Sequence, residues 1–244
     1  MFRKYKRLLI YKIKKKINID LDQNTENETL DYLFNFYGSD KAEHWNSGKG
    51  HGYSKFYNQE LKDKKNETIN ILEIGSYSGA SAAAFSKFFS MSKIFCLDFN
   101  ITNFKYKSQK IDVHGIDVTK RNEILSFFKT IDLNNDKQYF DIIIDDGSHK
   151  LHDMLFAFNI FFKNLKSNGI YVIEDFGYPK YFEHLNDKNE VKVEKFLDNL
   201  ENRIFFNSVI FNKDDQIFLM DNVKNIKTFK GNSKGADIAF IKKV

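Results

Sequence analysis

The middle of the chain alternates short apolar runs with longer amphipathic stretches. The apolar runs predict strands over Ile69–Ile74, Ile94–Asp98, Val113–Asp117, Phe140–Asp145 and Ile170–Ile173. The amphipathic stretches predict helices from the Gly79 turn through Phe89, over Lys120–Lys129 and over Leu151–Lys166. Because parallel strands need crossover connections, this alternation predicts a doubly wound α/β fold with a mainly parallel sheet.

The pattern changes after Pro179. We expect a charged helix over about 189–201, strands over Ile204–Phe211 and Gln216–Asp221, and a terminal strand over Ile238–Lys242. The polar run Asn212–Asp215 between two apolar runs predicts a turn. These features together predict an antiparallel hairpin at the edge of the sheet.

Three parts of different character follow one another along the chain. Residues 1–19 form a basic tail, and residues 20–64 form a helical cap with a helix over Glu28–Tyr37, a loop containing Gly and His, and a short helix ending near Lys62. Residues 65–244 form the doubly wound domain. The 244 residues are 42% hydrophobic, enough for one sizeable core.

The charge is unevenly distributed. The net charge is +5, but residues 1–19 hold eight Lys or Arg and no acid, which leaves 30 basic and 33 acidic residues in the rest of the chain. A nucleic-acid groove would place cations along the fold, so we expect no nucleic-acid partner. The tail is either a frayed, solvated terminus or a basic amphipathic helix that contacts a membrane peripherally. In both cases we expect catalysis to be independent of it.

Cysteine content and hydropathy restrict the location and the type of metal site. The single Cys96 excludes a disulfide framework and a multi-cysteine zinc site, so metal ligands would be oxygen or histidine. No apolar run approaches the ~20 residues of a membrane span, and Leu8–Tyr11 is too short for a signal-peptide core. We therefore expect a cytoplasmic protein, with peripheral contact at the inner face of the membrane left open.

A glycine turn follows the first predicted strand of the domain. The spacing is E-x-G-x-x-x-G, from Glu73 through Gly75 to Gly79, at a position where open α/β sheets bind ligands. It differs from the dinucleotide pattern G-x-G-x-x-G, which disfavours a nicotinamide oxidoreductase. Asp98 ends the next strand, where a carboxylate accepts from ribose hydroxyls, and Asp117 ends the third, where it would accept from an adenine amino group. An aspartate at a strand end is also often a turn or helix cap.

Carboxylates also follow the last two strands of the predicted parallel sheet. Asp145-Asp146-Gly147-Ser148-His149 follows one strand and Glu174-Asp175 follows the next. Oxygen ligands suit Mg²⁺, with Mn²⁺ or Ca²⁺ as alternatives. His149 could accept the proton of a substrate hydroxyl. The alternative is that these residues only cap a helix or lie solvated in loops.

The glycine turn and its acidic partners resemble class I S-adenosylmethionine-dependent methyltransferases, over roughly residues 65–175. The resemblance implies a Rossmann-like fold and S-adenosylmethionine as cofactor. The chain departs from the family pattern at Tyr77, where the family often has glycine. The cofactor contacts implied in the domain are Glu73, Gly75, Ser76, Gly79, Asp98, Asp117 and Asp145.

The motifs D-D-G-S-H and V-I-E-D-F resemble the metal-dependent sugar O-methyltransferases of the mycinamicin and macrocin type, with cephalosporin-hydroxylase-like relatives. This resemblance implies Asp146, Glu174 and Asp175 as metal ligands, and His149 with Asp146 as catalytic residues. Tyr37-Gly38-Ser39-Asp40-Lys41 and His51-Gly52-Tyr53 resemble the segment that folds over the cofactor in that family. The contacts implied there are Tyr37, Lys41 and Tyr53.

The implied reaction is methylation of a sugar hydroxyl. The acceptor would be a surface glycan precursor of capsule or lipopolysaccharide, a nucleotide-linked sugar, or a glycosylated metabolite, and the family implies a homo-oligomer. Two alternatives stay open. One is an RNA or protein methyltransferase on the same fold, and the other is a non-catalytic module that binds a membrane or polyanion through its basic tail.

Overall fold

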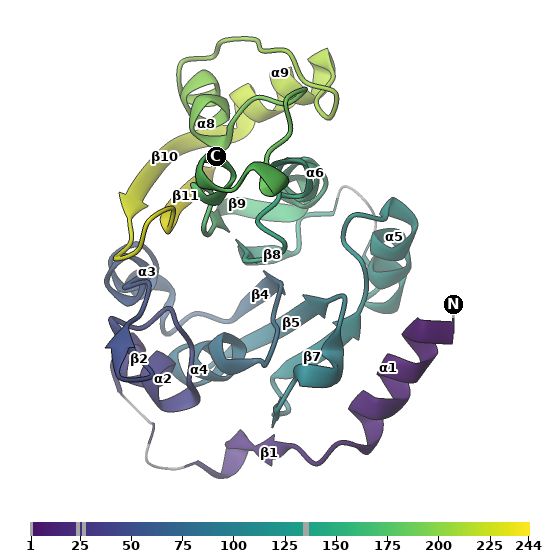
Figure 1. Cartoon of the computed structure of the whole chain (residues 1–244), viewed down its shortest axis with the longest axis vertical. Helices are drawn as coiled ribbons and strands as arrows, with labels where there is room; N and C mark the ends of the chain where they lie inside the picture. The colour runs from purple at the N-terminus through teal and green to yellow at the C-terminus, as the bar shows by residue number, and fades with distance from the viewer. Residues whose placement is uncertain (1, 23–24, 26–27, 134–136) are drawn as a thin grey trace. The chain divides into compact units, whose positions relative to one another are not determined.

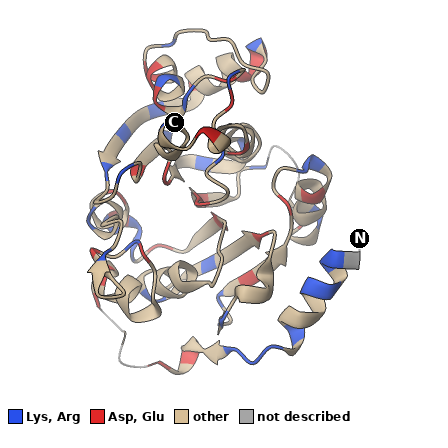
Figure 2. Cartoon of the chain, viewed as in Figure 1, with Lys and Arg blue, Asp and Glu red and all other residues tan. Residues whose placement is uncertain are grey.

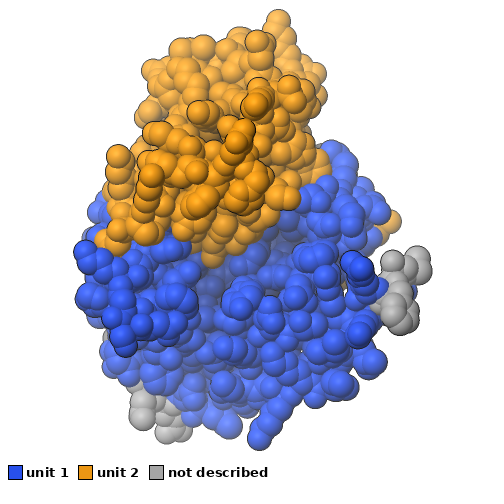
Figure 3. All heavy atoms as spheres, viewed as in Figure 1, with its two compact units in different colours: residues 1–127 blue, residues 128–244 orange. Residues whose placement is uncertain are grey.

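The structure is a computed structural model that describes residues 2–22, 25, 28–133 and 137–244 (Figure 1). The chain divides into two compact units, residues 1–127 and residues 128–244 (Figure 3). Each unit carries a set of hydrogen-bonded strands with its own helices, and the two are described in turn.

Three parallel strands form the centre of the first unit. β4 (Ile69–Ile74) pairs with β5 (Ser92–Asp98), and β5 pairs with β7 (Ile111–Gly115). The apolar side chains are in register, with Ile71 opposite Ile94 and Ile94 opposite Ile111. Helix α4 (Ala80–Phe88) connects β4 to β5, and α5 (Arg121–Thr130) follows β7. The parallel order is the one that the strand–helix alternation predicts.

The cap of the first unit consists of two helices and a small hairpin. These are α2 (Leu30–Tyr37), α3 (Ser54–Leu61), β2 (His44–Trp45) and β3 (Gly48–Lys49). Thr29 caps the start of α2 by accepting from the backbone N–H of Tyr32. Phe34 of α2 packs edge-on to Phe85 of α4, with ring centroids 5.2 Å apart. Aromatic packing therefore holds the cap on the helix that follows the glycine turn.

The basic tail is an ordered helix. α1 (Phe2–Ile13) lies beside β7 in Figure 1 and also contacts η4 (Ile101–Asn103), and its cations stand out in Figure 2. The chain then pairs β1 (Ile17–Asn18) with β6 (Tyr106–Lys107). Of the two alternatives for the tail, the structure shows the helix, and its contact with a membrane stays a prediction. No helix in the described part of the chain is both long enough and apolar enough to span a membrane.

Short 3₁₀ helices complete the first unit and recur in the second. Their bounds are Ile19–Leu21 (η1), Lys62–Lys64 (η3), Phe162–Asn164 (η5) and Glu183–Leu185 (η6).

The second unit combines parallel and antiparallel pairing. β8 (Phe140–Asp145) pairs in parallel with β9 (Leu165–Ile173). β11 (Asp237–Lys243) runs antiparallel to β9, and β10 (Val223–Lys230) runs antiparallel to β11. The helices are α6 (Leu151–Phe161), α7 (Tyr178–Tyr181), α8 (Val193–Glu201) and α9 (Lys213–Asn222). An antiparallel hairpin is present, as predicted, but it is formed by β10 and β11.

The predicted strands over Ile204–Phe211 and Gln216–Asp221 are wrong. The first segment has no regular structure, and the second lies in α9. The polar run before it is a capping box: Asn212 accepts from the backbone N–H of Asp215, and the Asp215 carboxylate accepts from the N–H of Asn212. The polar residues that suggest a hairpin turn in the sequence therefore form the start of a helix.

Candidate active site

The glycine turn of the first unit has three residues in the left-handed region. Gly75 has a φ of 85°, Tyr77 of 40° and Gly79 of 77°. Tyr77 therefore adopts a backbone conformation that favours glycine although it carries a large side chain, at a cost of about 1 kcal/mol or more. Its backbone N–H donates to Oδ2 of Asp98 at 2.7 Å, which holds the turn against the end of β5.

Gly79 has no room for a side chain. A Cβ at this position would overlap the ring of Phe104, which is fully buried. The left-handed backbone and the close ring both require glycine, so the close packing of Phe104 fixes the start of α4.

Glu73 is buried at the end of β4. Its carboxylate accepts from the Ser81 hydroxyl of α4 and lies 4.0 Å from Sγ of Cys96. Burial, and then the nearby Glu73, raise the pKa of the Cys96 thiol well above its usual value. The hydroxyl of Ser76 donates to the Glu73 carbonyl at 3.3 Å. These contacts give Glu73 and Ser76 a part in holding the turn, while their contact with a cofactor stays a prediction.

Asp98 and Asp117, the two other acidic residues predicted to contact the cofactor in this unit, accept hydrogen bonds from the backbone. Asp98 is half-buried and accepts from the N–H groups of Tyr77 and Asn100, at 2.7 and 2.6 Å. Asp117 accepts from the hydroxyl of Thr119 at 2.6 Å and pairs with Lys120 at 2.9 Å. Burial alone would raise the pKa of Asp117, but these bonds from Lys120 and Thr119 lower it. Asp117 thus also has the turn role that an aspartate at a strand end often has, and its contact with adenine stays a prediction.

The three residues predicted in the cap are folded into its interior. The hydroxyl of Tyr37 donates to Asp22 at 3.2 Å, and the Tyr37 carbonyl accepts from the hydroxyl of Tyr106 at 2.7 Å. The backbone N–H of Tyr53 donates to the carbonyl of Lys41 at 2.9 Å. Lys41 and Tyr53 have side chains that are at most 1% exposed. The two predicted cap motifs are therefore joined to each other through their backbones.

The second unit brings two carboxylates and an imidazole together. Asp146 follows β8, His149 lies three residues further, and Asp175 follows β9. Nε2 of His149 is 3.9 Å from Oδ1 of Asp146 and 3.9 Å from Oδ2 of Asp175. These distances are too long for hydrogen bonds, and all three ligand atoms lie within 4.8 Å of one another. We call these three residues the metal cluster.

The backbone of the metal cluster is strained. His149 and Asp175 both have a φ of 54°, which is uncommon for residues with side chains and occurs at functional sites. Among the described residues, the buried Nδ1 of His149 has no hydrogen-bond partner. Two carboxylate oxygens and a ring nitrogen that lie this close together are a donor set that fits a divalent cation.

Two further acidic residues lie beside the metal cluster. Asp145 ends β8, where burial raises the pKa of its carboxyl to about 8. Glu174 is 1% exposed, and its backbone N–H donates to the Asp145 carbonyl at 2.9 Å. The cluster that the structure assembles contains His149 with Asp146 and Asp175, so Glu174 as a ligand and Asp145 as a cofactor contact stay predictions.

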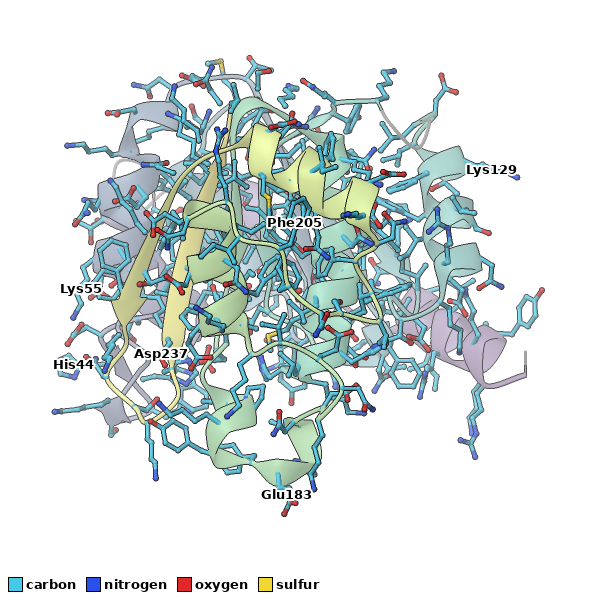
Figure 4. All side chains as sticks on the ribbon, turned by 90° about the horizontal axis from the view of Figure 1, so that it is seen from above. His44, Lys55, Lys129, Glu183, Phe205 and Asp237 are labelled. Atoms are coloured by element: carbon cyan, nitrogen blue, oxygen red, sulfur yellow. The ribbon has the colours of Figure 1, made fainter. Side chains whose placement is uncertain are left out.

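Tyr178 is a neighbour of the metal cluster that the sequence patterns do not indicate. Its ring lies edge-on to that of His149, and its backbone N–H donates to the carbonyl of Asp175 at 3.0 Å. The backbone N–H of Phe176 donates to the carbonyl of Asp237, at the start of β11 (Figure 4). Glu183, further along in η6, points outward in the same view. The only sequence feature that could have indicated Tyr178 is an aromatic residue shortly after the Glu174-Asp175 pair.

Comparison with known proteins gives consistent relatives. No protein-family model matches the chain. It is 32% identical over 160 residues to the L-olivosyl-oleandolide 3-O-methyltransferase of Streptomyces antibioticus, covering 62% of this chain and 38% of that protein. It is 25% identical over 138 residues to the mycinamicin VI 2''-O-methyltransferase of Micromonospora griseorubida, covering 51% of this chain and 31% of that one. The chain thus spans about a third of the length of these relatives.

A solved structure resembles nearly the whole chain. The MycE methyltransferase of the mycinamycin biosynthetic pathway, in complex with Mg, SAH and mycinamycin VI, has a TM-score of 0.67 and 20% identity, and covers 90% of this chain and 55% of its own. The resemblance indicated by the sequence motifs is therefore confirmed: the chain has the Rossmann-like fold of the class I methyltransferases and is similar in sequence to the oleandolide and mycinamicin O-methyltransferases.

Proposed function

We propose that this protein is an S-adenosylmethionine-dependent O-methyltransferase that requires a divalent cation and methylates a hydroxyl group of a sugar. The metal cluster is the observation that carries the proposal, because it follows the ends of β8 and β9 in a chain that has the methyltransferase fold. The names of the sequence relatives support the same reaction class.

The transfer is a single displacement. The acceptor oxygen attacks the methyl carbon of the sulfonium, the C–O bond forms as the C–S bond breaks, and the electron pair goes to sulfur to give the neutral thioether. The hydroxyl proton needs an acceptor, and His149 provides one in its imidazole. The carboxylates of Asp146 and Asp175 each lie 3.9 Å from Nε2 and would stabilise the imidazolium.

Asp146 and Asp175, with the predicted Glu174, would hold the cation, and the imidazole of His149 would then remain the proton acceptor. When bound, a divalent cation lowers the pKa of a coordinated hydroxyl and fixes its direction. Mg²⁺ suits a site dominated by carboxylates, and it is the ion present with MycE. The fixed backbone of the cluster residues would orient the acceptor, and orientation provides much of the rate of a methyl transfer.

In the first unit, the glycine turn with Asp98 and Asp117 would bind the cofactor. Asp98 accepts hydrogen bonds from two backbone N–H groups, and its remaining lone pairs can accept from ribose hydroxyls. The glycine turn brings backbone close to a ligand at the carboxyl end of β4. Asp145, Tyr37, Lys41 and Tyr53 complete the proposed set of cofactor residues.

The acceptor is proposed as a glycosylated metabolite or a surface glycan precursor of capsule or lipopolysaccharide. The relatives that act on sugars of macrolides support the first class. A cytoplasmic protein that works as a homo-oligomer and contacts a membrane peripherally through α1 fits the second class. Exposed apolar side chains at Tyr5, Leu9 and Ile13 between the cations of α1 support that contact.

Calorimetric titration tests the donor site first. S-adenosylmethionine and its demethylated product SAH should both bind in the micromolar range, with Mg²⁺ or with chelator present. Turnover of a sugar acceptor should then stop in chelator and return with Mg²⁺. Folded protein that binds neither compound would refute the proposed function.

A further inference from the structure

We infer that α1 is part of the cofactor-binding site, where it positions the three turns that carry the proposed cofactor residues. These turns, which we call the cofactor turns, are residues 75–79, residues 98–103 and residues 117–120. The inference rests on the proposed function, because it assigns the turns to the cofactor. It reverses the expectation that the tail is independent of catalysis.

The first link joins α1 to the turn of Asp98. Nη1 of Arg7 donates to the carbonyl of Phe99 at 3.0 Å, and the guanidinium lies 3.8 Å from the centroid of the Phe99 ring. Phe99 is the residue directly after Asp98, and 57% of it is exposed. A residue so exposed has few other contacts to fix it, so the stacked guanidinium and the hydrogen bond restrict its motion.

The second link joins α1 to the turn of Asp117. Nζ of Lys4 pairs with Oε2 of Glu123 at 2.7 Å, and the same oxygen accepts from the backbone N–H of Asp117 at 3.0 Å. Glu123 is thus a bridge between a cation of α1 and the backbone of the turn. The link depends on charge, so it is the one that salt would weaken.

The third link reaches the glycine turn. Tyr11 packs edge-on to Phe104, with ring centroids 6.4 Å apart, and Phe104 fills the space against Gly79. Lys14, the residue directly after α1, donates to the carbonyls of Thr102 and Asn103, at 2.8 and 3.3 Å, which ties the end of α1 to the segment just before Phe104. One helix is therefore linked to all three cofactor turns within a single compact unit, directly to residues 98–103 and through Glu123 and Phe104 to the other two.

This arrangement has a consequence for affinity. A cofactor that binds three separate turns loses binding energy if the turns must first be ordered. The contacts of α1 with these turns reduce that cost in advance. Arg7 and Lys4 are accordingly positioning residues that act through Phe99 and Glu123.

The test measures the Kd of SAH by calorimetry with the full chain and four variants, well below the unfolding temperature. We expect Arg7→Ala to raise Kd about tenfold, because it removes both a hydrogen bond and the stacking of the guanidinium on Phe99. Lys4→Ala should raise Kd about threefold, because it removes a half-exposed ion pair. Lys4→Arg should restore the affinity. Lys12→Ala, which changes an exposed cation on the same helix, is the matched control and should bind as the unaltered protein does.

Adenosine provides a readout that a general loss of stability would not move. Because the turns at Asp98 and Asp117 face the nucleoside in the proposed site, Arg7→Ala should weaken adenosine by the same factor as SAH. Unchanged Kd values for Arg7→Ala and Lys4→Ala, or equal losses in Lys12→Ala, would overturn the inference and leave the proposed function in place. Failure of the unaltered protein to bind SAH would overturn both.

Discussion

The ring of Tyr178 lies edge-on to the imidazole of His149, with the two ring centroids 5.4 Å apart. The backbone of Tyr178 is bonded to Asp175, so one residue contacts two members of the metal cluster. Edge-to-face packing favours one orientation of the imidazole. Tyr178 therefore restricts how His149 can turn toward a hydroxyl.

Replacement of Tyr178 should separate positioning from chemistry. Tyr178→Ala should lower kcat about tenfold because the imidazole loses its aromatic neighbour, with little effect on the KM of the methyl donor. Tyr178→Phe keeps the ring and should retain kcat within about twofold. Steady-state rates at saturating donor and acceptor measure both, and an equal loss in the two variants would point to the hydroxyl instead of the ring.

Removal of the proposed base should act on turnover and leave the donor site intact. His149→Ala should lower kcat by about a hundredfold or more, the usual contribution of a general base. His152→Ala is the matched control, because His152 is nearly half-exposed and lies beside Asp153. Turnover at saturating acceptor decides the matter, and full activity in His149→Ala would remove this residue from the mechanism.

The proposed metal ligands can be tested without turnover. Asp175→Asn keeps the shape of the side chain but removes a charge, so Mn²⁺ affinity should fall by about tenfold or more. Asp153→Asn, on α6, changes an acid outside the cluster and should leave Mn²⁺ binding unchanged. Electron paramagnetic resonance counts free Mn²⁺ directly, and equal affinity in the two variants would place the cation elsewhere.

The contact between α1 and Glu123 should depend on pH. Burial alone would raise the pKa of Glu123, but the hydrogen bonds from Lys4 and the Asp117 backbone lower it below its usual value of 4.5. A pKa lower in the folded state means that the stabilisation is present above the unfolded value and is lost as pH falls through the folded one.

Thermal unfolding from neutral to acid pH measures this effect. The contribution should be about 1 kcal/mol or less, because Lys4 is half-exposed. Glu123→Gln lacks the titrating group, so its stability should fall less steeply with acid than that of the unaltered protein. Parallel curves for the two proteins would show that this contact contributes nothing.

The start of α9 provides a test of local stability. Asn212→Ala removes the capping side chain and should cost about 1 kcal/mol, a decrease of a few degrees in Tm. Asn207→Ala, in the exposed segment before it, is the control and should unfold like the unaltered protein. Urea unfolding compares the two, and a loss below a few tenths of a kcal/mol would mean that α9 is held by packing alone.

The sequence predicted the strands of the domain well because buried apolar runs leave few alternatives. β4 and β8 have the predicted bounds, and the acidic residues after β8 and β9 lie where the parallel pairing puts them. The region before β10 was mispredicted for a physical reason. A polar run before a short apolar one is common to a hairpin turn and a helix cap, and a short apolar run does not distinguish strand from helix.

The roles of single side chains were harder to predict than the positions of strands. Asp146, His149 and Asp175 converge because they come shortly after two strands that pair with each other. Glu73 has a partner in Ser81 that only the folded backbone brings within reach, whereas the bond of Asp117 to Thr119, two residues on, is the local turn contact left open in the sequence. The partner of Arg7 is 92 residues away in sequence, and no periodicity indicates such a contact.

The close packing of Phe104 on Gly79 also bears on how this protein can diverge. Gly79 cannot change independently: a side chain at 79 needs a smaller one at 104, and the left-handed backbone would still oppose it. Homologues that keep α1 should therefore retain the two residues as a pair, whereas homologues without it should vary first at position 104. Covariation between these positions would then trace the gain or loss of the N-terminal helix during the history of the family.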